Sequence, residues 1–264
     1  MSVISRFKKN NKRTVEFFRA IPGLFKMFRE QTNIPVLKIA LLVFSSKFIN
    51  MIVMFMPLKM LFVLSGSKNI SFLHDMEQNL GRDVYIAVML GIISVLYFFN
   101  IILSVYQIKL VNKQKNNISI KDYYFNDEVK SHSTILKIYG PFCQILADFL
   151  LIGTVITTLF FLNTYFALYY MFVVFIYSII VEQWAFSTHD SKLMGKLGID
   201  SKQFIRIAGV LIFFLSFIGI LAVVLNLKIS VIFAVLMLIL VRLSNGALKS
   251  LFYCQIKIRA HLLK

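Results

Sequence analysis

One carboxylate lies inside a long apolar run of the sequence. Asp148 occurs in ILADFLLIG, and Gln144 precedes it by one helical turn, so the two side chains share a face if the run is helical. An ionised side chain in a run of this kind is costly to keep away from water. It usually faces the protein interior and has a partner of opposite charge. Asp148 is therefore the first residue for which we expect a specific role, with Gln144 beside it.

Two basic residues in other apolar runs are candidates to pair with Asp148. Lys47 is the first, because both residues lie about ten positions, or roughly 15 Å, into runs that enter from the same side. Arg242, in the last run and approached from the opposite side, is the second. One interpretation is a proton or substrate site near the middle of a membrane. The other is a buried ion pair that fixes helix register, which we favour because we find no second buried acid for a proton relay.

Other residue types with chemical potential are scattered along the chain. The four histidines lie in separate links or tails, HExxH is absent, and Cys143 and Cys254 form no CxxC motif. GxSxG is also absent, and the adjacent acids Asp127 and Glu128 lie in a basic link, where they balance charge. We therefore predict no metal site, no cofactor and no catalytic residue, and the sequence carries no positive sign of an enzyme.

The composition indicates a membrane protein. Hydrophobic residues make up 58% of the 264 residues, and 27 residues are Phe. A water-soluble domain cannot cover that much apolar surface. Six runs have the length of about 20 mostly apolar residues that a membrane helix needs. Over residues 37–264 we predict an all-α bundle of six transmembrane helices, at 37–64, 84–106, 138–162, 165–183, 207–225 and 229–248.

The net charge of +17 also favours a membrane protein over a nucleic-acid-binding protein. Lys and Arg concentrate in the N-terminal tail, in the links 107–137 and 184–206, and in the C-terminal tail, where they flank apolar runs. Membrane proteins keep such an excess in their cytoplasmic segments. We therefore expect both termini in the cytoplasm, a bacterial inner membrane as the location, and no nucleic-acid partner.

The basic tail over residues 1–36 contains one patterned stretch. Apolar residues recur at helical spacing in 13–30, RTVEFFRAIPGLFKMFRE. This pattern predicts an amphipathic helix in the membrane interface, with its apolar face in the lipid. Its basic face would attract anionic lipid headgroups, and the candidate residues are Arg13, Arg19, Lys26 and Arg29. A disordered basic tail is the alternative, because Pro22 and Gly23 disfavour a helix interior.

The order of these elements is similar to that of a known family. An interfacial helix precedes a long first span with Pro57 near its outer end, followed by an outer loop, a second span and two hairpins with almost no outer loop. The pattern is carried by MIVMFMPLKMLFVLSGS, ILADFLLIGTVITTLFFLNTYFALYYMFVVFIYSII and VVLNLKISVIFAVLMLILVRLSNGALKSLF. It resembles the transmembrane domain of six-helix ATP-binding cassette exporters.

The resemblance implies an integral membrane subunit of a transport or export system. Its halves would pair as a homodimer or within a larger membrane complex. The phosphate-binding motif GxxxxGK[ST] is absent from the sequence, so the energy source would be a separate ATPase subunit or one that the sequence does not reveal. Pro57 is a candidate hinge, since proline kinks helices.

The cytoplasmic links depart from the exporter pattern. In the family, long helical arms carry the coupling helices that the ATPase binds. The link 184–206 could reach out and back only about 15 Å as two helical arms. The alternative is therefore an accessory, scaffold or immunity-type membrane protein that reuses the exporter fold and transports nothing.

Overall fold

The computed structural model describes residues 17, 19–30, 36–64, 82–118, 122–125, 128–186, 198–227, 229 and 231–262. Six long helices account for most of them, and two short strands form an antiparallel hairpin. The helices are α2 (Val36–Leu64), α4 (Arg82–Asn117), α5 (His132–Leu162), α6 (Thr164–Trp184), α8 (Ser201–Leu227) and α9 (Val231–Leu262), and the strands are β1 (Asp122–Phe125) and β2 (Glu128–Ser131).

Within this described part, all six long helices are apolar enough over a sufficient length to cross a membrane. A helix satisfies its own backbone hydrogen bonds, which a lipid environment requires. The chain is thus a multi-pass, helical integral membrane protein, as its composition predicts.

The helices agree with the six predicted spans but several run further. α4 continues past residue 106 to Asn117, α5 begins at His132 rather than 138, and α9 continues past 248 to Leu262. Hydrophobicity marks only the part of a helix that lies in lipid, whereas Lys, Gln and Leu in the extensions are good helix formers. The short hairpin β1–β2, in the link 107–137, was not expected, but with two strands of four residues it leaves the predicted all-α class unchanged.

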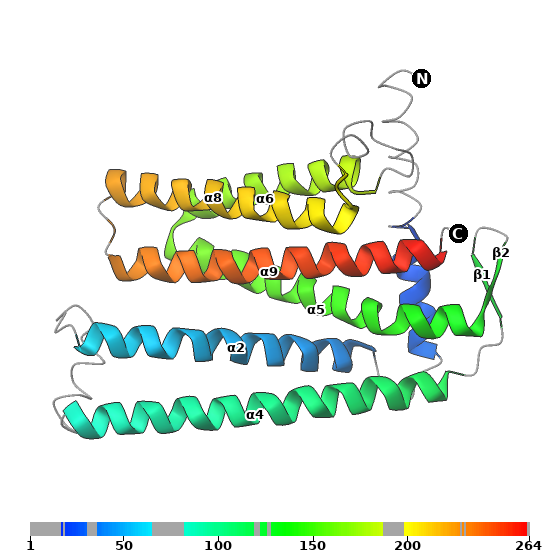
Figure 1. The fold of residues 1–264 in the computed structure, drawn as a ribbon, viewed down its shortest axis with the longest axis horizontal. Coiled ribbons are helices and arrows are strands. Elements are labelled where there is room, and N and C mark those ends of the chain that lie inside the picture. Colours follow the sequence, from blue (N-terminus) through cyan, green and yellow to red (C-terminus); the bar gives the residue numbers. More distant parts are fainter. Residues whose placement is uncertain are drawn as a thin grey trace, which may run out of the picture.

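Figure 1 shows the order of the helices across the bundle. α6 and α8 lie at the top of this view, α9 and α5 follow below them, then α2, and α4 lies at the bottom. α5 runs obliquely, so it contacts α9 along its length and also packs against α2 and α6. The middle helices α5 and α9 therefore pack against α6 and α8 on one side and against α2 on the other, and α4 packs mainly on α2.

A tight turn joins α5 to α6. Asn163 ends α5 and caps α6, because its Oδ1 accepts a hydrogen bond from the backbone N–H of Phe166 at 2.8 Å. Side-chain oxygens of Asn satisfy the free N–H groups at the start of a helix. The two-residue NT link of the sequence thus makes a sharp reversal, and the first two turns of α6 pack through the buried Phe166 and Tyr170.

A further helix, over residues 19–30, crosses one end of the bundle (drawn in blue in Figure 1). Its Leu24 and Phe28 are buried, and the Phe28 ring meets Tyr139 of α5 edge-to-face with centroids 5.1 Å apart. The expectation that this face lies in lipid is therefore wrong for these residues, which pack on protein. The helix is amphipathic, as expected. Its apolar face packs against the end of the bundle.

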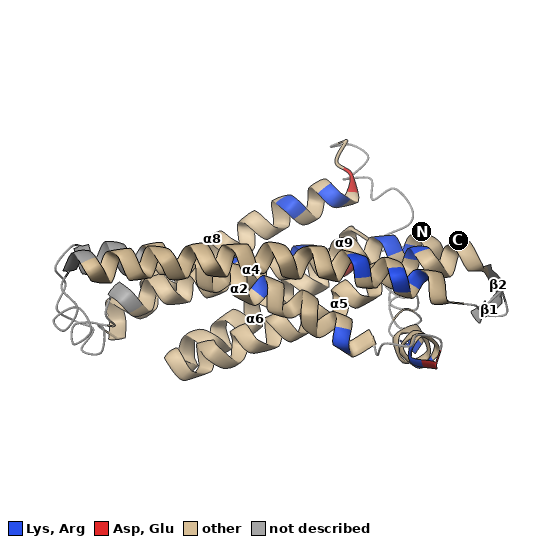
Figure 2. Cartoon of the chain, turned by 90° about the horizontal axis from the view of Figure 1, so that it is seen from below, with Lys and Arg blue, Asp and Glu red and all other residues tan. Residues whose placement is uncertain are grey.

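The opposite face of this helix is basic, since Arg19, Lys26 and Arg29 are exposed. Arg13, the fourth residue expected to meet lipid headgroups, lies outside the described residues. Figure 2 shows Lys and Arg gathered at the end of the bundle where this helix lies, and few charges toward the other end. The C-terminal end of α9 is at the same basic end (Figure 1).

Candidate functional site: a polar groove between α2 and α9

The structure brings Lys47 of α2 and Asp148 of α5 together in an ion pair. The Lys47 ammonium donates a hydrogen bond to Asp148 Oδ1. The Asp148 side chain has no exposed surface, whereas that of Lys47 is 25% exposed. A buried carboxylate is tolerated when it is paired, so the first of the two predicted partners is the one that the fold supplies.

Gln144 and Ser250 complete the surroundings of this pair. Both lie beside the Asp148 carboxylate, and Gln144 Nε2 donates a hydrogen bond to Ser250 Oγ at 3.2 Å. Gln144 lies one turn before Asp148 on α5, and Ser250 comes from α9. The polar cluster therefore connects α2, α5 and α9.

A cavity of about 410 Å³ adjoins the ion pair. Its walls are one face of α2 and one face of α9, and α5 closes it between them. Its polar lining comes from all three helices: Lys47 and Asn50, Gln144, and Arg242 and Ser250. Its apolar lining includes Met51, Met54, Leu151, Ile239 and Leu243. We name this feature the α2–α9 groove.

Arg242 lies in this groove without a partner. It is exposed, and it forms no ion pair, hydrogen bond or ring contact with any residue that the structure describes. The hypothesis that it pairs with Asp148 is therefore not what the structure shows. Arg242 lies 11 residues after the start of α9, which corresponds to roughly 16 Å and places it within the span of a bilayer about 30 Å thick.

Pro57 lies further along the same face of α2. Lys47, Asn50, Met54 and Pro57 follow one another at intervals of three and four residues, which align side chains on a helix. α2 continues through Pro57 to Leu64. The role of Pro57 as a hinge stays a prediction.

A second polar network, which the sequence analysis missed, joins α2 to α4. Ser46 Oγ donates to Asn100 Oδ1 at 2.8 Å, and Asn100 Nδ2 donates to Asn50 Oδ1 at 2.7 Å. Ser and Asn side chains hydrogen-bond across membrane helices in this way. The signal was present in the sequence, because Asn50 and Asn100 interrupt otherwise apolar runs.

A third polar cluster lies near the basic end of the bundle. Glu182 of α6 accepts hydrogen bonds from Gln255 Nε2 at 2.6 Å and from Arg259 Nη2 at 3.0 Å. The Arg259 guanidinium also lies 4.8 Å from the ring centroid of Phe17 and 4.1 Å from that of Phe186. In the sequence, Arg259 lies past the last predicted span, in the basic C-terminal tail. Because α9 extends to Leu262, Arg259 is instead a buried residue of a helix.

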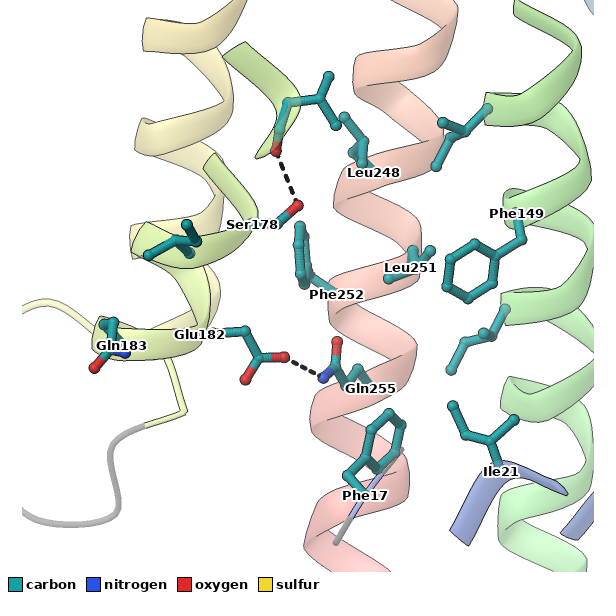
Figure 3. A pocket seen from close by; sticks show the side chains of 14 residues that line it. Phe17, Ile21, Phe149, Ser178, Glu182, Gln183, Leu248, Leu251, Phe252 and Gln255 are labelled. Atoms are coloured by element: carbon teal, nitrogen blue, oxygen red, sulfur yellow. Dashed lines mark hydrogen bonds between the residues drawn. The ribbon is translucent and has the colours of Figure 1, made fainter. Parts of the chain in front are cut away.

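Glu182 and Gln255 mark the polar end of a second cavity, of about 420 Å³, shown in Figure 3. Phe149 of α5 and Leu248, Leu251 and Phe252 of α9 form its apolar walls, and Phe17 lies at its lower end in this view. Its polar groups bind one another, as the dashed line from Gln255 to Glu182 indicates. In contrast to the α2–α9 groove, it presents no unpaired charge among the described residues.

Metal ligands do not gather in the part of the chain that the structure describes, where no three His, Cys, Asp or Glu side chains could share an ion. Cys143 and Cys254 are buried, free thiols. The α2–α9 groove is therefore the candidate site, and what it offers chemically is fixed charge and hydrogen-bond donors at membrane depth.

Fold and site together define a class: a multi-pass helical membrane protein with a polar groove inside its transmembrane region. Comparison of the chain with protein-family models, with curated protein sequences and with solved structures returned no match.

Proposed function

We propose that this chain is the membrane subunit of a transport or export system, and that the α2–α9 groove forms part of the path taken by its substrate. The observation that carries the proposal is the exposed, partnerless Arg242 at membrane depth. An arginine at the centre of a membrane helix costs about 2.5–3.5 kcal/mol on insertion scales, and such residues face a bundle interior or a water-filled cavity. A face that carries Arg242 is thus unsuited to lipid.

The groove needs a second wall, and this supports an assembly of at least two chains. It is open between α2 and α9, which do not pack against each other along their lengths. The element order that resembles ATP-binding cassette exporters supports the same arrangement, in which two halves face each other. A homodimer or a larger membrane complex, with a separate ATPase subunit, would complete the transporter.

A non-transporting accessory or scaffold protein is the second candidate. The observation that favours it is the shortness of the connection between α6 and α8, which end and begin at Trp184 and Ser201. Only 16 residues separate these helices, too few for the long arms on which an exporter's ATPase is mounted. In that case the groove would be filled by another membrane helix and not by water.

Cysteine accessibility in native membranes tests the proposal. In a chain with Cys143 and Cys254 changed to Ala, we expect Met54→Cys and Gly246→Cys to react with a charged, water-soluble methanethiosulfonate reagent. Met54 is exposed in the groove, and a Cβ at Gly246 meets nothing within 4 Å, so both substitutions fit. Such a reagent reacts with a thiolate in water.

Val95→Cys on α4 provides the matched control. Val95 is 69% exposed on an apolar helix face, and we expect it to meet lipid and stay unreactive. If both groove cysteines are as unreactive as Val95→Cys, then the groove holds no water and the proposed substrate path is wrong. That result would favour the accessory or scaffold protein.

A further inference from the structure

Arg242 is a charge that the described chain leaves without compensation. The α2–α9 groove contains two cations, Lys47 and Arg242, and the adjoining carboxylate of Asp148 is already bonded to Lys47. Asn50 and Gln144 add amide groups. In a low-dielectric setting a fixed positive charge attracts an anion strongly, so the groove is electrostatically suited to a negative group.

A second copy of the chain cannot supply that negative group from within its spans. Of the 12 acidic residues in the sequence, three lie in the six long helices: Asp148, Glu182 and Asp83, and Asp83 is the second residue of α4, just before the apolar span that begins at Val84. Asp148 is paired with Lys47, and Glu182 with Arg259 near the basic end of the bundle. The spans of this chain therefore offer no spare carboxylate for Arg242, which favours a bound ligand as the source of its counter-charge.

The remaining lining of the groove indicates what accompanies the anionic group. Met51 and Met54 line one wall, and Leu243 and Ile239 line the other. Methionine side chains are flexible and adapt to apolar ligands of varied shape. A cavity of about 410 Å³ also falls within the usual range for small-molecule sites, about 300–1,000 Å³.

We propose that the α2–α9 groove binds an amphipathic anion, with Arg242 as the counter-charge of its phosphate or carboxylate and the methionine-lined wall in contact with its apolar part. The Arg242 guanidinium is suited to this role because it is planar and can donate two parallel hydrogen bonds to either a phosphate or a carboxylate. This inference rests on the proposed function, since it names the ligand class of the same groove.

The test is binding of dodecyl phosphate to the full chain, purified in a maltoside detergent and followed by titration calorimetry. We expect dodecyl phosphate to bind, dodecyltrimethylammonium not to bind, and inorganic phosphate at equal concentration not to displace dodecyl phosphate. Arg242→Gln should weaken the binding of dodecyl phosphate at least ten-fold. Arg242→Lys should weaken it less, because a lysine keeps the charge but loses the fork.

Two further variants separate binding from folding. Arg206→Gln removes the same charge from an exposed position in the first turns of α8, outside the groove, and should bind as the unaltered chain does. Gly246→Leu adds a side chain where the structure leaves open space, and it should block the groove without disturbing a neighbour. Size-exclusion elution shows whether each variant is folded and monodisperse.

The outcomes are decisive in either direction. Equal binding by the unaltered chain and folded Arg242→Gln, or equal binding of the cationic detergent, overturns the proposal. Displacement by inorganic phosphate overturns its amphipathic part and identifies a small free anion as the ligand. If dodecyl phosphate fails to bind while Gly246→Cys still reacts with the water-soluble reagent, only the ligand class is wrong and the proposed transport path stands.

Discussion

At the scale of single residues, the charged side chains inside the bundle have different roles. Lys47 and Asp148 join α2 to α5, and Glu182 and Arg259 join α6 to α9, so each pair connects helices that are distant in sequence. Arg242 joins nothing among the described residues. Two pairs therefore specify how helices pack, and Arg242, which is unpaired among the described residues, is free to meet a ligand.

The Lys47–Asp148 pair should behave as a structural element. We expect Lys47→Met to lower the free energy of unfolding by about 3–5 kcal/mol, because it leaves the buried Asp148 carboxylate without a partner. The double variant Lys47→Met, Asp148→Leu should recover most of that loss, since two apolar residues leave no buried charge. Unfolding by sodium dodecyl sulfate in mixed micelles measures both effects.

Lys38→Met is the control for this experiment. Lys38 is exposed near the start of α2, and its loss should change stability by less than about 0.5 kcal/mol. A double variant as unstable as Lys47→Met would show that the pair does more than compensate charge, and would reopen a functional role for Asp148.

At the scale of elements, α8 is held to its neighbours by close approach at two glycines. A Cβ at Gly219 would lie 2.3 Å from the ring of Tyr169, and one at Gly209 would lie 2.1 Å from Cε of Lys249. The Tyr169 hydroxyl also donates to the backbone oxygen of Leu215 at 3.0 Å. Small residues let membrane helices approach closely enough for such contacts.

These two glycines should respond differently to the same substitution. We expect Gly219→Ala to cost about 1–3 kcal/mol, because the rigid Tyr169 ring must move and lose its hydrogen bond. Gly209→Ala should lower the free energy of unfolding by a smaller amount, because only the flexible end of the Lys249 side chain has to move. Thermal unfolding in detergent, monitored by circular dichroism, shows which of the two variants is less stable.

Gly153→Ala is the reference for this pair of variants. A Cβ at Gly153 meets nothing within 4 Å. The free energy of unfolding of Gly153→Ala should therefore stay the same or rise by up to about 1 kcal/mol. If Gly209→Ala proved more destabilising than Gly219→Ala, the close packing of α6 on α8 would not depend on Tyr169.

At the scale of the whole molecule, charge is distributed along the bundle axis. Basic residues gather at the end where α9 finishes and the helix over 19–30 crosses the bundle (Figure 2). Membrane proteins retain such charge in the cytoplasm. The same end carries the extensions of α4, α5 and α9 beyond the predicted spans. We therefore predict that this end faces the cytoplasm and would meet any cytoplasmic partner.

This asymmetry predicts the orientation of the chain in a bacterial inner membrane. A green fluorescent protein fused after Lys264 should fluoresce, because it folds in the cytoplasm, and alkaline phosphatase at the same position should be inactive. Alkaline phosphatase fused after residue 70, in the link between α2 and α4, should be active. The opposite pattern would show that the basic end faces outward.

Much of the fold can be predicted from the sequence, because each membrane helix must satisfy its own backbone in lipid and so shows its presence locally. The runs around Asp148 and Arg242 are recognisable as helices without knowledge of their neighbours. The charge of Asp148 likewise predicts a partner, since an unpaired carboxylate is too costly there. These statements depend only on residues within one segment.

Tertiary structure decided which faces meet. It paired Asp148 with Lys47 and left Arg242 in an open groove, and it buried Arg259 between Phe17 and Phe186. It also turned the apolar face of the N-terminal helix toward α5 instead of lipid. Hydrophobicity cannot make these choices, because a lipid-facing and a protein-facing side chain are equally apolar in a membrane, and only packing and the pairing of polar groups distinguish them.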